Sequence, residues 1–426
     1  MSKTSPLRRG RTPLFLSTLS ALVLAALPCL ASAQPFGSFS PRAMGMGGAL
    51  VAAGTPSDAA FGNPALLSSR QRHGSFALVL PTFTARATNA RDYRNKVDAV
   101  KSAYNAAKRY VPNCVGQTCT GQQKTEALNA LSSLNSSLTA IDGEPVSADV
   151  LGGTSVGIPG HDFGVSLFAD SRVVGGAVAH YASKDRQNIA TAEQQIRNNG
   201  QTTVDPSQNV YSTANFRGAM VTEFGIAMAH RFGGLHLGSL PVGDLSVGFT
   251  PKFQRVRTVD YTEQVNRSSF SLNNATRRYS DVNFDAGVAD RIGNDWRVAL
   301  AGHDLSSKSY RTAGGHVIHL KPAVRAGVSR SNGWLTLTAD YDLTTNGSAS
   351  GLTGRTRFLD LGAELNAFDV LQLRLGYEDN TASGRTTVGH ALTAGVGFRV
   401  LGVHFDVAAL KGGNDLGGAF QAGVDF

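Results

Sequence analysis

Apolar and polar residues alternate along most of the chain, from about residue 147 to the C-terminus. Leu245, Val247 and Phe249, for example, are separated by Ser246 and Gly248. A period of two is typical of β-strands that have one apolar face and one polar face. The predicted strands are 74–85, 148–158, 162–182, 213–232, 243–259, 278–291, 295–304, 320–330, 333–343, 356–366, 369–379, 389–400, 402–411 and 417–426.

The strand count depends on 162–182, which contains the pair Gly175–Gly176. We interpret this segment as one long kinked strand, which makes about fourteen strands in all. Splitting it would give an odd number, whereas bacterial single-chain barrels have even numbers.

The connections between the strands differ in length. Short links such as 293–295 and 331–333 alternate with long polar links such as 184–212 and 305–319. Short turns on one side and long loops on the other are typical of outer-membrane barrels. The chain also ends on Phe426, which closes an apolar strand. We therefore predict an all-β fold, an antiparallel transmembrane β-barrel of about fourteen strands; a soluble periplasmic β protein is the alternative.

A helical period replaces the alternation between about 92 and 141. Val97, Val100 and Tyr104 are spaced by three and four, and a leucine series repeats this spacing from 128 to 138. We expect an α-helical hairpin at 86–146, inserted between the first two strands; the pattern leaves open whether it lies outside the barrel or in its lumen. Cys114 and Cys119, which lie between the two helical stretches, are candidates for a structural disulfide, because an exported chain folds in an oxidising compartment. Their spacing is not C-x-x-C, which disfavours a thioredoxin-type redox site.

The first 33 residues have the pattern of a cleaved signal peptide: basic residues, an apolar run and the site Ala31–Ser32–Ala33. Its removal lowers the formal charge from +9 to +5, because four of the Lys and Arg residues belong to it. Only 17% of the residues are charged and 48 are Gly. This composition disfavours a disordered chain, and no basic run interleaved with aromatic residues suggests nucleic acid. We predict export to the bacterial outer membrane.

A glycine-rich segment precedes the first strand. It has neither the Lys–Ser/Thr that follows a phosphate loop nor a surrounding βαβ unit. The run "RAMGMGGA", a downstream Asp and "NPA" stand out in it. The residues of this motif are Arg42, Gly45, Gly47, Gly48, Asp58, Asn63 and Pro64.

This motif resembles the N-terminal plug of the outer-membrane long-chain fatty-acid transporter (FadL-like) superfamily. The layout, with a helical insert after the first strand, is most similar to the branch of conjugal transfer TraF-type barrel proteins. The resemblance implies that 34–72 form a plug in the mouth of a fourteen-stranded barrel formed by 73–426. Other proteins called TraF are thioredoxin-like, and the missing C-x-x-C separates this chain from them.

Charged residues occupy the strand positions opposite the apolar face. A basic residue on the lipid side would cost about 2–4 kcal/mol near the bilayer midplane, so we place these side chains in the lumen. They form either a polar conduit or a cross-strand lattice of salt bridges. The candidate lumen residues are Glu223, Lys252, Asp285, Arg297, Arg325, Asp340, Glu364, Arg374, Glu378, Arg399, His404 and Asp406, with Asp425.

Such a lining disfavours, without excluding, a carrier of hydrophobic molecules, which needs a mainly apolar pocket. An apolar site between plug and wall is the alternative, near Phe36, Phe39, Met44, Met46 and Phe61, although simple packing of the plug also explains these residues.

No nucleophile elbow or zinc-binding motif is found, so we expect neither an enzyme nor a metal or other cofactor. Two functions remain. The first is a passive transporter of hydrophobic or amphipathic small molecules, or an envelope component of conjugal transfer. The second is a non-transporting scaffold that binds a secretion or mating apparatus through the helical insert and the long loops. The expected partners are outer-membrane lipid, an apolar ligand and envelope or conjugation proteins, and not nucleic acid.

Overall fold

The computed structural model describes residues 40–68, 76–233, 236–237, 240–241, 243–265, 275–347, 351–352, 354–383 and 388–426. The predicted signal peptide, Phe36 and Phe39 lie outside these ranges. Among the described residues, no helix is long and apolar enough to cross a membrane.

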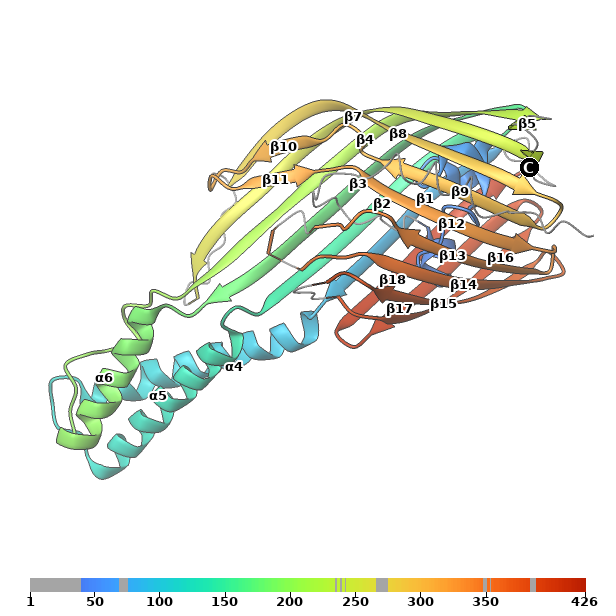
Figure 1. Cartoon of the computed structure of the whole chain (residues 1–426). Coiled ribbons are helices and arrows are strands. Elements are labelled where there is room, and N and C mark those ends of the chain that lie inside the picture. The colour runs from blue at the N-terminus through green and yellow to red at the C-terminus, as the bar shows by residue number, and fades with distance from the viewer. Residues whose placement is uncertain are drawn as a thin grey trace, which may run out of the picture. The chain divides into compact units, whose positions relative to one another are not determined.

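Fourteen antiparallel strands close into a barrel, in the order β1-β18-β17-β16-β15-β14-β13-β12-β9-β8-β7-β4-β3-β2 (Figure 1). The predicted fold class is confirmed. The segment 162–182 forms one strand, whose pairing is uninterrupted across Gly175–Gly176. The strands are β1 (Ala77–Thr88), β2 (Pro145–Ile158), β3 (Phe163–His180), β4 (Thr213–Gly233), β7 (Asp244–Gln264), β8 (Thr276–Ile292), β9 (Trp296–His303), β12 (Ala323–Ser331), β13 (Leu335–Asp342), β14 (Phe358–Ala367), β15 (Leu371–Asn380), β16 (Ala391–Val400), β17 (Val403–Gly412) and β18 (Asp415–Asp425).

The wall has an apolar outer face and a polar inner face, as the alternation predicts. On β7, Phe249 is 45% exposed, whereas Thr250 and Gln254 are 1% and 0% exposed. Leu373 on β15 and Phe405 on β17 also face outward, at 44% and 50%. A belt of exposed large apolar side chains around a closed barrel is the surface that lipid covers.

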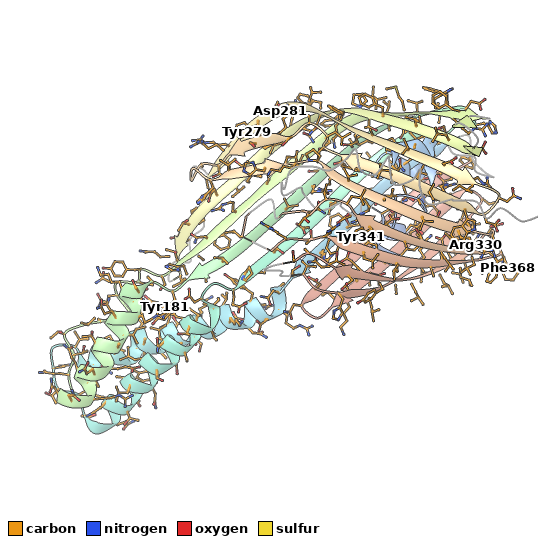
Figure 2. The ribbon with its side chains drawn as sticks, in the orientation of Figure 1. Tyr181, Tyr279, Asp281, Arg330, Tyr341 and Phe368 are labelled. Atoms are coloured by element: carbon orange, nitrogen blue, oxygen red, sulfur yellow. A yellow bond between two sulfur atoms is a disulfide. The ribbon has the colours of Figure 1, made fainter. Side chains whose placement is uncertain are left out.

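The two rims of the barrel differ. The chain enters β1 and ends after β18 at the same rim, where Phe76 N donates to Phe426 O at 3.0 Å. The connections at this short-turn rim are tight, and Phe368, which is 97% exposed, points away from the barrel there (Figure 2). Phe368 and Asp369 both have positive φ, 59° and 57°, as the two central residues of a type I′ turn do, and Val370 N donates to Ala367 O across this turn at 3.1 Å.

The opposite, long-loop rim carries three helices. They are α4 (Ala90–Tyr110) and α5 (Gly121–Ile141), which connect β1 to β2, and α6 (Ser183–Asn199), which connects β3 to β4. They share a core with the short helix η2 (Val111–Cys114), in which Leu131 and Ile189 are buried. Cys114 and Cys119 form a disulfide between η2 and α5. In Figure 1 the helices lie beyond the strand ends, outside the barrel.

The interpretation of 184–212 as a loop was wrong, because the whole first half of this link is α6. The apolar stripe of this helix is narrow, consisting of Ile189, Ala192 and Ile196, and polar residues surround it in the sequence. These three side chains are buried against α5 only in the folded chain, which makes α6 the third helix of the insert.

The link 305–319 is also structured. It contains the hairpin β10 (Lys308–Arg311) and β11 (Val317–Leu320). Tyr310 and Leu320 of this hairpin are buried against Val221 of β4 and Val256 of β7. The hairpin therefore covers the inner face of these long strands. A second small hairpin at the short-turn rim pairs β5 (His236–Leu237) with β6 (Leu240–Pro241).

The glycine-rich segment fills the barrel as a plug of three short helices, α2 (Pro41–Gly45), α3 (Pro56–Ala59) and η1 (Pro64–Leu67). Each begins with Pro, whose fixed φ suits the first helical position. Ser40 Oγ caps α2 by accepting from Ala43 N at 3.2 Å, and Asn63 Oδ1 caps η1 by accepting from Ala65 N at 3.1 Å. The turns are thus fixed locally, while the wall supplies the remaining contacts.

Candidate functional site

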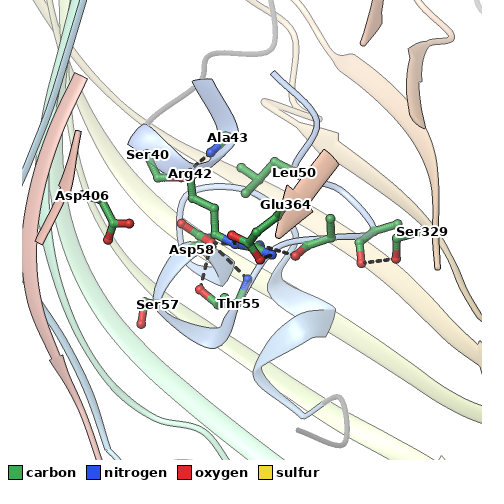
Figure 3. Close-up of polar contacts among 12 residues, drawn as sticks. Ser40, Arg42, Ala43, Leu50, Thr55, Ser57, Asp58, Ser329, Glu364 and Asp406 are labelled. Atoms are coloured by element: carbon green, nitrogen blue, oxygen red, sulfur yellow. Dashed lines mark hydrogen bonds and ion pairs between the residues drawn. The ribbon is translucent and has the colours of Figure 1, made fainter. Parts of the chain in front are cut away.

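An arginine of the plug makes the main side-chain contact with the wall. Arg42 Nε and Nη2 donate to the two carboxylate oxygens of Glu364 on β14, at 2.9 and 2.8 Å (Figure 3). Arg42 also donates to Ala53 O and lies 3.9 Å from Asp58, so it joins both halves of the plug. Burial alone would lower the pKa of the Arg42 guanidinium, but the ion pair with Glu364 outweighs it and the pKa is raised above its ordinary value.

The wall also binds the backbone of the plug. Asp340 Oδ2 on β13 accepts hydrogen bonds from Leu50 N and Val51 N, at 2.7 and 2.8 Å. Ser329 Oγ and Arg297 Nη1 both donate to Ala52 O, at 3.1 Å each. Charged hydrogen bonds to otherwise unpaired backbone groups are strong in a buried setting. These side chains therefore hold an irregular segment in a fixed place.

Arg325 on β12 is the centre of a second contact network. It is 2% exposed, and it forms ion pairs with Asp342 at 2.6 Å and Asp360 at 2.5 Å. Its Nη1 also donates to Gly48 O at 3.2 Å. This guanidinium thus neutralises two buried carboxylates and contacts the plug at the same time.

Two glycines of the plug motif have a backbone that only glycine adopts readily. Gly47 and Gly48 have φ of +74° and +100°. A Cβ on Gly47 would lie 2.7 Å from the carbonyl oxygens of both Leu361 and Tyr377, so a side chain has no room against the wall. The hydroxyl of Thr393 on β16 accepts from Gly47 N at 2.9 Å and donates to Gly45 O at 3.1 Å. These glycines bring the plug backbone directly onto the strands.

The rest of the motif stabilises the end of the plug. Asp58 forms a capping box with Thr55 at the start of α3. Asn63 Nδ2 donates to Val51 O at 3.0 Å and to Val288 O at 3.4 Å, and it is fully buried. The motif residues therefore have structural roles in the plug, at its turns and wall contacts.

A polar pocket lies below the plug, on the side of the short-turn rim. This lower pocket has a volume of ≈ 590 Å³ and is lined by residues of the plug and of β14–β18. Arg374 bridges Glu364 and Asp406, at 2.6 and 2.5 Å, and Arg399 lies 3.3 Å from Asp425. His404 Nδ1 lies 3.4 Å from the same Asp425 carboxylate. Charges of both signs are paired across this pocket.

A second cavity lies above the plug, on the side of the long-loop rim. This upper cavity has a volume of ≈ 780 Å³, part of it open to solvent. Its apolar lining consists of Met44, Leu151, Val174, Phe358, Val388 and Leu410, with Ala85. Its polar lining consists of Thr84, Arg86, Asp149, Arg172, Thr356 and Glu378. A concave site that combines an apolar wall with converging polar groups is typical of small-molecule binding.

Arg86 and Asp149, two charged residues of the upper cavity, differ in their contacts. Arg86 on β1 pairs with Glu378 at 2.8 Å and Asp415 at 3.1 Å, and its guanidinium lies 5.6 Å from the Phe358 ring centre. Asp149 on β2 stands opposite Arg86 in the strand register. Within the described ranges, however, its carboxylate makes neither a hydrogen bond nor an ion pair.

A third cluster lies in the wall of the long strands. Lys252 Nζ is 3.1 Å from Glu223, 2.9 Å from Asp285 and 2.9 Å from Asp304. It is 4% exposed, so the cluster is closed to solvent. Within the described ranges, no group of three or more His, Cys, Asp and Glu side chains could hold a metal ion.

The structure thus places the candidate lumen residues in separate groups. Glu223, Lys252 and Asp285 form the closed cluster, while Arg325 and Asp340 bind the plug backbone, as does Arg297. Glu364, Arg374, His404, Asp406 and Arg399 surround the lower pocket, and Glu378 lines the upper cavity. Of the apolar candidates, Met44 lines the upper cavity, Met46 is fully buried and Phe61 packs on Phe168.

Sequence reasoning missed Arg86, Asp149 and Arg172. The predicted first strand ended at 85, whereas β1 continues to Thr88. Asp149 and Arg172 lie in predicted strands, but the inward face there also carries Leu151 and Val174, so it lacks the alternation that marked the other strands. A strand face that carries both apolar and polar side chains does not produce the alternation by which we assigned the other strands.

Comparison with known proteins supports the architecture. Two solved structures match with a TM-score of 0.50. One is a deltaS2S3 mutant of the monoaromatic hydrocarbon channel TodX, 10% identical, with 91% of this chain and 99% of that chain covered. The other is a Pseudomonas aeruginosa FadL homologue, 13% identical, with 93% and 100% covered. At these identities the likeness shows the fold alone.

Among the curated proteins, none matches the chain. A protein-family model, described as "F plasmid transfer operon, TraF, protein", matches residues 60–342, which is more than half of the sequence. The chain has the barrel fold of the FadL-type channels and belongs to the family described as F plasmid transfer operon, TraF, protein.

Proposed function

We propose that this protein is a passive transporter of hydrophobic or amphipathic small molecules in the bacterial outer membrane. The observation that carries the proposal is the upper cavity between the plug and the barrel wall, whose apolar lining includes Met44, Phe358 and Leu410. The outward apolar belt supports residence in a membrane, and long loops face the exterior in barrels of this class. The cavity then opens toward the outside of the cell.

The plug explains why such a transporter would not leak ions. The lumen of a barrel of this size is filled by side chains and by the plug, which is bound to the wall at Glu364 and Asp340. An apolar molecule could enter the upper cavity while the polar contacts below remain closed. Passage beyond the plug then needs only a local rearrangement, because the energy source is the concentration gradient alone.

Uptake of 1-N-phenylnaphthylamine by intact cells tests this proposal, since lipopolysaccharide excludes this apolar dye. We expect cells that produce the protein to take up the dye several-fold faster than cells with the empty vector. Leu410→Trp, which fills the cavity, should return the rate to the vector level. Leu373→Trp introduces the same ring on the outer face, where Leu373 is 44% exposed, and should leave uptake unchanged.

Correct insertion of each variant is verified by heat-modifiable migration in detergent gels. Leu151→Trp fills the cavity from another strand and replaces Leu410→Trp if that variant does not fold. Uptake that does not exceed the vector level, or that both cavity-filling variants leave unchanged, would refute the proposal.

We infer a second candidate function from the helical unit: a scaffold that binds envelope or conjugation proteins. The three helices have their own buried core and a disulfide at the long-loop rim, which a transporter does not need. The family description, which names a plasmid transfer operon, supports the same idea. Replacing residues 92–141 by a short Gly/Ser linker should abolish partner capture by cross-linking while dye uptake continues; capture that survives the deletion would exclude this role.

A further inference from the structure

We infer that the upper cavity selects amphiphiles with a cationic head, and that Asp149 is the residue that recognises the head. This inference rests on the proposed transport function and specifies the class of its substrate. It begins from Asp149, which lines the cavity and has no hydrogen-bond or ion-pair partner within the described ranges.

The two arginines that line the cavity already have partners. Arg86 is shared between Glu378 at 2.8 Å and Asp415 at 3.1 Å, so one guanidinium faces two carboxylates. Arg172 on β3 is likewise engaged within the protein. A ligand carboxylate would have to displace these contacts and would lie beside the Asp149 carboxylate. An anionic head is therefore disfavoured.

Asp149 is suited to bind a cationic ligand head. It lines the cavity, and within the described ranges its carboxylate has no hydrogen-bond or ion-pair partner. An ammonium group can donate to it without displacing a hydrogen bond, and would share the carboxylate with the more distant charges of Arg86 and Arg172. Charge-assisted hydrogen bonds of this kind are about twice as strong as neutral ones.

Two hydroxyl groups give independent support for a bound ligand. Thr84 and Thr356 are 1% and 7% exposed and line the same cavity, yet the Oγ1 atoms of both have no hydrogen-bond partner within the described ranges. A buried unpaired hydroxyl is costly, so such groups usually have a partner in the functional state. Thr84 stands opposite Leu151 in the register of β1 and β2, two positions along from the Arg86–Asp149 pair.

The apolar part of the ligand then packs on the rest of the lining. Met44 of the plug and Leu410 of β17 belong to one buried cluster, and Phe358 and Val388 complete the wall. A cationic head at β2 with an apolar chain directed toward β17 spans the cavity from its polar to its apolar side. A primary alkyl ammonium ion has this chemistry.

Binding of three matched ten-carbon probes tests the inference: decylammonium, decanol and decanoate. The full mature chain is placed in phosphatidylcholine nanodiscs, and heats measured with empty nanodiscs are subtracted in isothermal titrations. We expect decylammonium to bind at least about tenfold more tightly than decanoate, the value of one hydrogen bond to a charged group. Asp149→Asn should weaken decylammonium binding about tenfold and leave decanol unchanged.

Asp379→Asn is the matched control. Asp379 follows the cavity residue Glu378 on β15, so the variant makes the same charge change on the other face of the strand. It should bind all three probes as the unchanged chain does. Because the head is detected by charge and not by shape, Asp149→Glu should retain the preference for decylammonium.

The outcomes separate the inference from the function on which it rests. Decanoate binding as tightly as decylammonium, or Asp149→Asn weakening all three probes equally, would overturn the cationic preference while dye uptake still supports transport. Failure of every probe to bind, together with absent dye uptake, would overturn both.

Discussion

The lower pocket and the upper cavity contain similar polar residue types, but these residues differ in whether they have hydrogen-bond or ion-pair partners. In the lower pocket, Arg42 and Arg374 share Glu364, and the carboxylate of Asp425 accepts from Arg399 and lies 3.4 Å from His404 Nδ1. In the upper cavity, Asp149 and the hydroxyls of Thr84 and Thr356 have no partner within the described ranges. Paired charges fix a structure, whereas unpaired polar groups beside a cavity can gain a partner when a ligand binds. We therefore assign the lower pocket to holding the plug and the upper cavity to binding.

The largest expected loss of stability follows from replacing Arg325, which contacts both the plug and the wall. Arg325→Met leaves Asp342 and Asp360 buried without their cation, and we expect it to lower the free energy of unfolding by about 3–5 kcal/mol. Urea titration of the protein in detergent, followed by circular dichroism, measures this loss. Arg330→Met is the matched control, because Arg330 is 55% exposed and its pair with Asp295 is 3.8 Å long. A loss no larger than that of the control would contradict the role of Arg325.

The role of the lower pocket is tested directly by releasing the plug. Arg42→Met removes the two hydrogen bonds to Glu364, which still keeps Arg374 at 2.6 Å, so we expect a smaller loss of about 2 kcal/mol. The plug should detach more often, and ion conductance across planar bilayers should increase. Arg399→Met changes a charge in the same pocket that is 40% exposed and does not contact the plug. Equal conductance in the two variants would show that Arg42 does not hold the plug closed.

The sequence predicted the barrel wall better than the contents of the barrel. The alternation places Asp340 and Glu364 on the inner face, because side-chain direction in a strand depends only on local parity. It could not show that they bind Leu50 and Arg42, which are separated from them by 290 and 322 positions. These contacts exist only after the barrel has closed around the plug. Asp149 was missed for a related reason, since a binding face mixes Leu151 with polar residues and has no clean period.

The smallest expected effects come from removing one hydroxyl group, either that of Thr393, which contacts the plug, or that of Thr84, which lines the upper cavity. Thr393→Val removes an acceptor for Gly47 N and a donor to Gly45 O, so we expect a loss of about 1–2 kcal/mol in the free energy of unfolding. Thr84→Val removes a hydroxyl that is equally buried but unpartnered, so the ligand-free protein should lose less than about 0.5 kcal/mol.

The same urea titration measures both valine variants, and decylammonium titration of Thr84→Val gives the second half of the comparison. If the Thr84 hydroxyl serves a ligand, this variant binds the probe more weakly although its stability is unchanged. If Thr84→Val instead destabilises the ligand-free protein as much as Thr393→Val does, the hydroxyl is already satisfied without a ligand. The Thr84 hydroxyl would then give no reason to assign ligand binding to the upper cavity and not to the lower pocket.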